Sequence, residues 1–276
     1  MKNKWTGATV LMTGGGSGIG RALSLAMAQR GATVIVTDIN GDAAAQVASE
    51  CGETATAHTL DVRDAEAVRQ RVDAVVRDHG RIDYLFNNAG MGVGGEAHEI
   101  SLAAWERVLD VNVRGVMHGV VAAYPLMVKQ GGGHIVNTAS LAGLGPAPLL
   151  TPYGMSKHAV VGLTTSLRIE AAAYGVRVSA LCPAAIETPL LDAENPEDLP
   201  AIAWRPDVRR FLTRLAGPPY PVEKFAKEAL DGIDRNQGII VIPARARLGW
   251  RLGRWAPGLV EKISGQVVTG ERALRK

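Results

Sequence analysis

The sequence predicts an α/β protein of a single domain, in which a doubly wound, seven-stranded parallel sheet is covered by helices on both faces. Short runs of β-branched residues alternate with longer stretches of helical periodicity, a pattern typical of parallel strands joined by helices. Most of these runs are apolar at consecutive positions, as expected for strands buried on both sides. A length of 276 residues fits one large domain of this kind.

The expected strands and helices follow one another along the whole chain. The strands occupy residues 8–12, 32–37, 54–60, 82–86, 134–138, 176–181 and 239–242. The helical stretches occupy residues 20–30, 42–50, 65–78, 102–129 and 153–174. In the third helix, Val68, Val72, Val75 and Val76 form an apolar stripe. Ligands of doubly wound sheets bind beyond the carboxyl ends of the strands, so functional residues are expected directly after the strands.

Composition and charge exclude several classes of protein. A content of 47% hydrophobic and 21% charged residues is typical of a globular protein, and no apolar stretch reaches the roughly 18 residues of a membrane span. The N-terminus lacks the apolar core of a signal peptide. Cys51 and Cys182 are too few for a disulfide framework, and no Cys or His cluster indicates a metal site. We therefore expect a cytoplasmic protein without a metal, and the net charge of +3 gives no indication of nucleic-acid binding.

We divide the chain into one large domain, residues 1–243, and a basic amphipathic tail, residues 244–276. Within the first part, residues 187–221 contain seven prolines together with large apolar residues such as Trp204 and Phe211. A long insertion of this kind inside a compact domain is usually functional. We expect it to form a partly helical lid over a substrate.

The tail combines a basic excess with an apolar stripe. It holds eight basic and two acidic residues, and its stripe consists of Leu248, Leu252, Trp255, Leu259 and Ile263. Arg247, Arg251 and Arg254 lie beside the stripe, as in helices that rest on anionic lipid, although Gly249, Gly253 and Pro257 interrupt a continuous helix. We favour packing over the protein's own substrate cleft or on a neighbouring subunit, and keep contact with a membrane surface as the alternative.

A glycine-rich loop joins the first strand to the first helix. Glycines let the backbone turn sharply and approach a ligand, and the free N–H groups at the helix start attract anions. The loop is therefore expected to hold the pyrophosphate of a dinucleotide, although its spacing departs from the common G-x-G-x-x-G pattern. The residues expected to contact the cofactor are Gly14, Ser17, Gly18, Ile19 and Gly20.

Asp38 ends the second strand about 20 residues beyond the loop, where a carboxylate can accept hydrogen bonds from both ribose hydroxyls. The same charge would repel a 2′-phosphate, so we expect NAD rather than NADP as the cofactor. Ser17 favours NAD too, because it stands where a basic residue could have met that phosphate. The alternative is that Asp38 only begins a turn with Asn40 and Gly41.

Ser140 follows the fifth strand, and Tyr153 and Lys157 lie four residues apart at the start of the next helix. This spacing places the tyrosine and the lysine on the same helical face. A cation one turn away, together with the positive nicotinamide of the oxidised cofactor, favours the phenolate. Tyr153 is therefore expected to act as the general acid or base of a hydride transfer, with Lys157 lowering the pKa of its phenol. Ser140 would donate a hydrogen bond to the substrate oxygen.

Together, the glycine loop, Asp61-Val62 after the third strand, Asn88-Ala89-Gly90 after the fourth and the Tyr-x-x-x-Lys pair resemble the short-chain dehydrogenase/reductase family. The resemblance covers residues 6–243 and implies a Rossmann-type fold. It implies that Asp61 and Val62 contact the adenine, and that Asn88, Ala89 and Gly90 line the cofactor while stabilising the central sheet.

The resemblance extends to further residues. It implies that Asn112 holds a water that links Lys157 to solvent, and that Lys157 holds the nicotinamide ribose. The residues that match the family beyond the sixth strand, near the nicotinamide carboxamide, are Pro183, Ile186 and Thr188, whereas Ala184 replaces a usual glycine. The family further implies a homo-oligomer, a dimer or a tetramer formed through the two long helices.

The expected substrate pocket is apolar. Residues 141–150 carry no charge, and residues 91–95 and the lid complete the wall, although Arg205, Arg209 and Arg210 could turn inward. We therefore expect an NAD-dependent enzyme that interconverts a bulky hydrophobic secondary alcohol and its ketone.

Two alternatives belong to other classes. A catalytically silent nucleotide sensor or scaffold on the same fold would need a defect in Ser140, Tyr153 or Lys157, and all three are present. A sugar-nucleotide epimerase or dehydratase shares the Tyr/Lys pair but usually has the other glycine spacing and a larger C-terminal substrate region.

Overall fold

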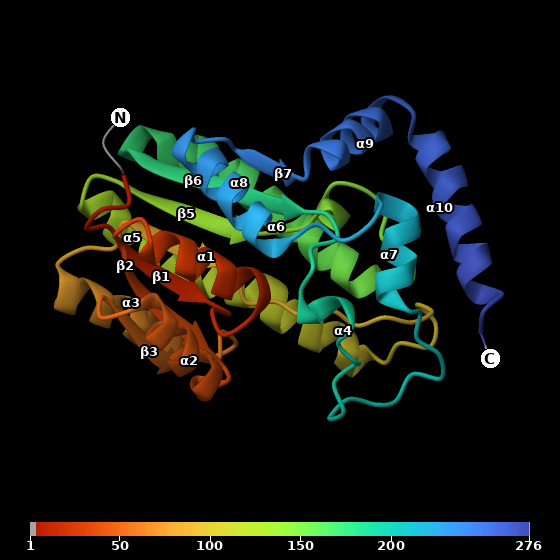
Figure 1. Ribbon diagram of the computed structural model, residues 1–276, viewed down its shortest axis with the longest axis horizontal. Coiled ribbons are helices and arrows are strands. Elements are labelled where there is room, and N and C mark those ends of the chain that lie inside the picture. The colour runs from red at the N-terminus through yellow and green to blue at the C-terminus, as the bar shows by residue number, and fades with distance from the viewer. Residues whose placement is uncertain (1–3, 276) are drawn as a thin grey trace.

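The computed structural model describes residues 4–275, which form one sheet with helices on both of its faces (Figure 1). The strands are all parallel and pair in the order β3-β2-β1-β4-β5-β6-β7. Their bounds are β1 Thr9–Thr13, β2 Thr33–Asp38, β3 Ala55–Thr59, β4 Tyr84–Asn87, β5 Gly133–Thr138, β6 Val176–Pro183 and β7 Ile239–Ile242. The predicted doubly wound sheet is confirmed, and each strand lies within two residues of its expected bounds.

The helices form two layers and a C-terminal arm. Their bounds are α1 Gly18–Ala28, α2 Gly41–Cys51, α3 Ala65–His79, α4 Leu102–Leu109, α5 Gly115–Lys129, α6 Thr151–Ala171, α7 Val208–Ala216, α8 Val222–Asp234, α9 Ala244–Trp255 and α10 Pro257–Arg272. Helices α1, α2 and α8 share a hydrophobic core with one face of the sheet, and α3, α5 and α6 share a second core with the other face. None of the helices within residues 4–275 is long and apolar enough to cross a lipid bilayer.

Alternate residues of each strand enter the two cores. In β1, Val10 and Met12 face the core of α1, α2 and α8, whereas Leu11 faces the core of α3 and α5. The valine stripe of α3 is confirmed, because Val72 and Val75 are buried there. Burial on both faces explains why the strands are apolar at consecutive positions.

Two helical regions differ from their predicted extent. The stretch expected as one helix over 102–129 consists of α4 and α5 joined by a π-helical turn, Asp110–Arg114. A π turn holds one more residue than an α turn, and this one contains the fully buried Asn112. The second difference is α8, which was not predicted although its apolar positions recur at helical spacing.

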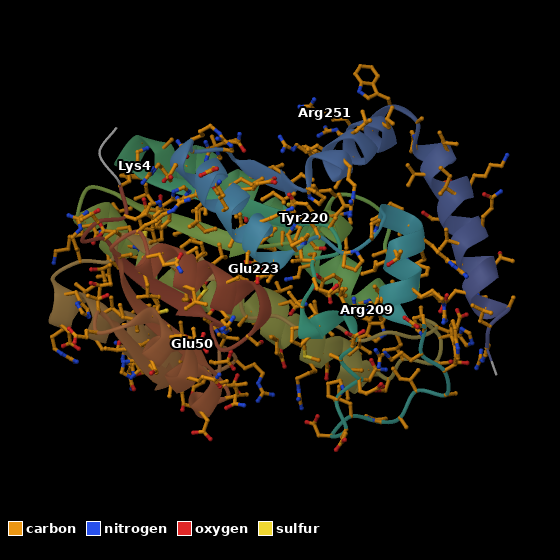
Figure 2. The ribbon with its side chains drawn as sticks, in the orientation of Figure 1. Lys4, Glu50, Arg209, Tyr220, Glu223 and Arg251 are labelled. Carbon is orange, nitrogen blue, oxygen red and sulfur yellow. The ribbon has the colours of Figure 1, made fainter. Side chains whose placement is uncertain are left out.

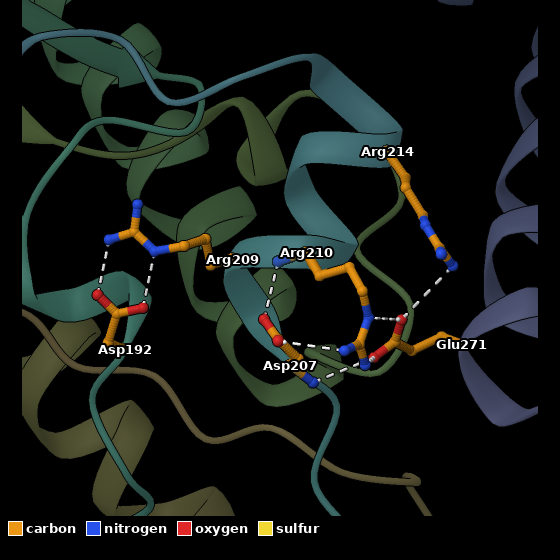
Figure 3. A network of polar contacts seen from close by, with 6 residues as sticks. All are labelled: Asp192, Asp207, Arg209, Arg210, Arg214 and Glu271. Atoms are coloured by element: carbon orange, nitrogen blue, oxygen red, sulfur yellow. Dashed lines mark hydrogen bonds and ion pairs between the residues drawn. The ribbon is translucent and has the colours of Figure 1, made fainter. Parts of the chain in front are cut away.

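The proline-rich segment is partly helical, as expected, and contains α7. The tail forms two helices, which meet at Ala256, and α10 runs beside α7 at one end of the molecule (Figure 1). Figure 3 shows the polar network that joins them, in which Arg210 of α7 donates to the fully buried carboxylate of Glu271 of α10. In the same network, Arg209 binds Asp192 within the proline-rich segment.

Candidate active site

A cavity of about 1090 Å³ lies beyond the carboxyl ends of the strands, at the place predicted for doubly wound sheets. Nearly all predicted site residues line it: Gly14, Ser17, Gly18, Ile19, Asp38, Asp61, Val62, Asn88, Ala89, Gly90, Ser140, Tyr153, Lys157, Pro183, Ile186 and Thr188. The two exceptions are Gly20 and Asn112, which lie behind the wall. A side chain at Gly20 would collide with the carbonyl oxygen of Gly14, so this glycine permits the close turn of the loop.

The start of α1 supplies free donors to the cavity. Ser17 precedes the helix but makes no side-chain capping bond, whereas Asn40, Asp64 and Ser101 cap the starts of α2, α3 and α4. The first N–H groups of α1 therefore lack an internal acceptor and face the cavity. Such a helix start fits a pyrophosphate, because its donors and the helix dipole both favour an anion.

Asp38 is held at the end of β2 by two backbone donors. Its carboxylate accepts hydrogen bonds at 3.0 Å from the N–H groups of Gly16 and Asn40. A Cβ at residue 16 would lie 3.0 Å from Asp38 Oδ2, so the glycine makes room for the carboxylate. Asp38 therefore both begins the turn with Asn40 and lines the cavity, so the turn does not exclude a contact with a cofactor.

Asp61, which was predicted together with Val62 to contact the adenine, forms an ion pair of 2.5 Å with Arg63. The guanidinium lowers the pKa of the Asp61 carboxyl, and it also lines the cavity together with Arg107. The sequence analysis missed both arginines. Only the spacing of Arg63, two residues after Asp61, could have indicated this pair.

Asn88 fastens the glycine loop to the centre of the sheet. Its side-chain amide donates to the carbonyl oxygen of Gly14 at 2.9 Å, and its Oδ1 accepts from the Thr138 hydroxyl at 3.1 Å. Its backbone N–H donates to the Thr13 hydroxyl. The residue therefore connects β1, β4 and β5, in agreement with the stabilising role that the family resemblance implies.

Ser140, Tyr153 and Lys157 meet at the end of β5. The Ser140 side chain is buried and caps the short turn that follows β5, while Tyr153 is partly exposed to the cavity. The Lys157 ammonium lies 5.5 Å from the centre of the Tyr153 ring and donates to the carbonyl oxygen of Thr138 at 2.8 Å. The predicted acid/base group, hydrogen-bond donor and cation thus lie together.

The pKa values of these groups reflect burial. Desolvation raises the pKa of the Tyr153 phenol, and a hydrogen bond with Ser140 opposes that rise. Desolvation lowers the pKa of Lys157 to about 8. The expected lowering of the phenol pKa by Lys157 is therefore not present in the protein alone and stays a prediction for the complex with the oxidised cofactor. A second buried group, the Cys182 thiol, has its pKa raised to about 12 by desolvation, as expected for an inert apolar residue.

Asn112 is connected to the catalytic helix through a residue that the sequence analysis missed. Its side-chain amide donates to the Ser156 hydroxyl at 2.9 Å, and Ser156 donates to the carbonyl oxygen of Tyr153 at 2.7 Å. Asn112 also bonds both backbone groups of Met91. The π-helical turn therefore connects the loop after β4 to the first turn of α6.

The segment after β6 follows the predicted course. The backbone N–H of Ala184 donates to the Ile242 carbonyl, and its φ angle lies outside the left-handed region, so alanine fits where the family usually has glycine. Thr188 lies against the glycine loop, where a Cβ on Gly18 would come within 3.3 Å of it.

The rest of the cavity wall is largely apolar. The three predicted segments contribute to it, and the tail adds a fourth. Representative members are Leu144, Leu150, Leu212, Leu215, Trp250 and Val260. Two of the three nearby arginines are engaged elsewhere, since Arg209 binds Glu187 and Asp192 and Arg210 binds Glu271. Arg205 pairs with the exposed Glu194 and reaches the cavity wall.

Comparisons with known proteins agree with this arrangement. A family model described as "short chain dehydrogenase" matches residues 8–199. Cyclohexanol dehydrogenase of Acinetobacter sp. (strain SE19) is 38% identical over 195 residues, which cover 69% of this chain and 78% of that protein. Levodione reductase of Leifsonia aquatica is 37% identical over 206 residues, covering 70% and 77% of the two chains.

A solved structure is similar over a larger share of the chain. The short-chain dehydrogenase/reductase of Burkholderia phymatum, in complex with NAD, superposes with a TM-score of 0.83 and 33% identity, covering 93% of this chain and 96% of that one. The parallel sheet with helices on both faces is the Rossmann-type fold that the resemblance implied, and Ser140, Tyr153 and Lys157 lie together on the cavity wall. The chain belongs to the short-chain dehydrogenase/reductase family, whose members are oxidoreductases.

Proposed function

We propose that the protein is an NAD-dependent alcohol dehydrogenase or ketoreductase, which interconverts a bulky hydrophobic secondary alcohol and its ketone. The observation that carries the proposal is the arrangement of one cavity. At one end, the uncapped start of α1 and the Asp38 carboxylate fit a dinucleotide. At the other, Ser140, Tyr153 and Lys157 converge beside an apolar wall.

A bound nicotinamide cofactor would supply hydride chemistry, as the acceptor of a hydride in oxidation of the alcohol and as its donor in reduction of the ketone. In the direction of oxidation, the Tyr153 oxygen takes the hydroxyl proton, and in reduction it gives that proton back. Ser140 donates a hydrogen bond to the substrate oxygen, which carries the developing negative charge. Lys157 favours the phenolate by its charge and holds the nicotinamide ribose, and Asn112 holds a water that links Lys157 to solvent.

The residues of the cofactor half favour NAD over NADP. The Asp38 carboxylate is anchored on the wall where the adenine ribose is expected, and it would repel a 2′-phosphate. The Burkholderia phymatum structure contains NAD, and a similar structure, 3-ketoacyl-(acyl-carrier-protein) reductase from Brucella melitensis, contains NADH, which supports this preference.

The apolar wall supports a hydrophobic substrate. Helix α7 and the tail line the cavity with apolar side chains, including Phe211, Leu212, Leu215, Trp250, Val260 and Ile263, and the tail adds two charged residues, Arg245 and Glu261. The lid carries one charged group toward it, Arg205, which is already paired with Glu194. One relative is named for cyclohexanol, an alcohol of this chemical class.

Two further features belong to the proposal. Large apolar side chains stay exposed on α5 and α6, among them Val121, Met155 and Ile169, which supports a homo-oligomer, a dimer or a tetramer, formed through these two helices. The expected location is the cytoplasm, in line with two free cysteines and no disulfide among residues 4–275.

A substrate screen tests the proposal. Hydroxysteroids, aryl alcohols, cyclic alcohols and aliphatic ketones are offered with each of the four nicotinamide cofactors, and the absorbance of reduced cofactor is followed. We expect turnover of bulky apolar alcohols with NAD. Turnover confined to small polyols or charged hydroxy acids, or confined to NADP, would contradict it.

A further inference from the structure

The tail carries an apolar stripe that packing leaves uncovered. Helices α9 and α10 form an elbow at one end of the molecule (Figure 1). On the outer side of this elbow, Leu248, Leu252, Trp255 and Leu259 keep 63%, 54%, 89% and 56% of their surface exposed. We call this set the outer stripe. An exposed tryptophan amid leucines on one helical face is unusual for a surface that meets only water.

Three arginines flank the outer stripe along α9. Arg247, Arg251 and Arg254 recur at spacings of four and three, each one residue before a member of the outer stripe, and all are exposed. Figure 2 shows Arg251 on the outer side of α9. Within residues 4–275, no acidic group lies within ion-pair distance of any of these three guanidinium groups. Their charge is therefore available to a partner.

The inner face of the same helices is turned toward the rest of the protein. Trp250 of α9 and Val260 of α10 line the cavity, and Val268 of α10 packs on Phe211 of α7. The Glu271–Arg210 pair then fixes α10 to α7. The tail therefore packs on the protein through its inner face, and the outer stripe stays exposed in this packed position.

The charge pattern distinguishes between two possible occupants of this surface. A second copy in a two-fold contact would bring three unpaired arginines of one chain against the same three of the other, and like charges across an interface oppose association. An anionic lipid surface instead attracts the arginines and accepts the leucines and the tryptophan at its boundary. Tryptophan is enriched at this depth of a bilayer.

We propose that the outer stripe and Arg247, Arg251 and Arg254 dock the protein on an anionic membrane surface. The tail then lies in the plane of the headgroups, with the outer stripe toward the lipid and the inner face still closing the cavity. This inference goes beyond the proposed oxidoreductase function and does not depend on it. Docking would place the C-terminal wall of the cavity beside the lipid.

Sedimentation with vesicles tests the docking. The full chain is mixed with vesicles of phosphatidylcholine alone or with phosphatidylglycerol added, and bound protein is measured in the pellet. We expect binding only to the anionic vesicles, and weaker binding at high salt. The triple variant Arg247→Gln, Arg251→Gln, Arg254→Gln should lower the partition coefficient by roughly 100-fold, since each basic residue contributes about fivefold at such a surface.

A matched control removes the same charge elsewhere. Lys224→Gln, Lys227→Gln and Arg235→Gln take three exposed positive charges from α8 and its end, and should leave binding within about threefold of wild type. If both triple variants lost vesicle binding equally, the binding would depend only on the net charge of the protein, and the proposal would be overturned. Absence of binding by the wild-type protein would overturn it too. Thermal melting of each variant shows that it is folded.

Quenching identifies the residue that meets the lipid. Lipids brominated on the acyl chain should quench tryptophan fluorescence of the wild type, and Trp255→Phe should abolish most of that quenching while it still sediments with the vesicles. Quenching that is unchanged in this variant would contradict the proposed orientation. Light scattering tests whether a second copy of the chain covers the outer stripe instead. It compares the oligomer mass of the double variant Leu248→Ser/Leu252→Ser with that of the wild type. A fall in oligomer mass would show that a second copy covers the stripe and would overturn membrane docking.

Discussion

The fully buried carboxylate of Glu271 accepts a hydrogen bond of 2.5 Å from the guanidinium of Arg210, 61 residues earlier in the chain. The same carboxylate also accepts from the backbone N–H of Asp207 at 3.1 Å. One acidic side chain of the tail thus holds the start of α7, which itself lines the cavity. The pair connects the C-terminal helices to the substrate end of the site.

Glu271→Gln should lower the free energy of unfolding by about 2 kcal/mol, because the neutral amide replaces a charge-assisted pair and leaves a buried donor without an acceptor. Chemical denaturation followed by circular dichroism measures the change. Glu223→Gln on α8, where the carboxylate is exposed, is the control and should stay within about 0.5 kcal/mol of wild type. Equal stability of the Glu271 variant and wild type would show that the pair contributes nothing to the docking of α10.

Asp38 should set the choice of cofactor. We expect the wild-type protein to bind NAD at least about tenfold more tightly than NADP, since the carboxylate repels the 2′-phosphate. In Asp38→Ala this ratio should fall toward one, and titration of cofactor fluorescence or calorimetry measures both constants. Asp42→Ala removes a nearby exposed carboxylate of α2 and should leave the ratio unchanged. Tighter binding of NADP by the wild type would refute this role of Asp38.

Lys157 should make the stability of the cofactor-free protein depend on pH. Burial lowers its pKa from 10.5 to about 8, so between these values the unfolded chain holds a proton that the folded protein has lost. The free energy of unfolding therefore rises with pH across this window, by about 3 kcal/mol from this one group. Below pH 8 the full cost of burying the ammonium remains, and above 10.5 it is gone.

The comparison with Lys157→Met isolates this contribution from other titrating groups. The stability of wild type relative to the variant should increase from pH 8 to pH 10.5. Lys129→Met, which changes an exposed lysine at the end of α5, should show a constant difference from wild type over the same range. A constant difference for Lys157→Met as well would mean that the amine titrates at its ordinary pKa.

Trp250 should limit the size of the substrate. Its side chain lines the cavity from α9, so Trp250→Ala should raise kcat/KM for a bulky polycyclic alcohol relative to cyclohexanol by about tenfold. Trp255→Ala changes the same residue type on the outer side of the same helix and should leave the ratio as it is. A ratio that does not change in Trp250→Ala would place the substrate away from the tail.

The strands and the site residues were predicted best where the evidence lies within one strand or at the start of one helix. The strands were predictable because burial on both faces demands continuous apolar runs, and the site residues because the carboxyl ends of parallel strands share one edge. Asp38 and Ser140 were placed by this rule, whereas Tyr153 was placed by its spacing from Lys157 at the start of a helix. Helix α8 carries an equally clear periodicity, with Phe225, Leu230 and Ile233 buried, but it lies directly after the proline-rich segment and was left unassigned.

Contacts between residues far apart in the chain could not be predicted from local sequence patterns. The Ser156 link between Asn112 and Tyr153 depends on a π-helical turn, and nothing in the spacing of residues 102–129 distinguishes such a turn from an α-helix. The tail stripe was visible in the sequence, but its periodicity does not tell which face is covered. Only the packing of Trp250 and Val268 shows that the outer leucines remain in solvent.

The turnover of Tyr153→Phe with NAD tests the central claim most directly, because the substitution removes one oxygen and keeps the ring. We expect kcat to fall by at least about 100-fold, the lower range for loss of a general acid or base. Binding of NADH, followed by its fluorescence, should stay within about threefold of wild type, since the ring still packs in place. A variant that binds NADH normally and retains turnover close to that of wild type would contradict the assignment of Tyr153 as the acid/base group.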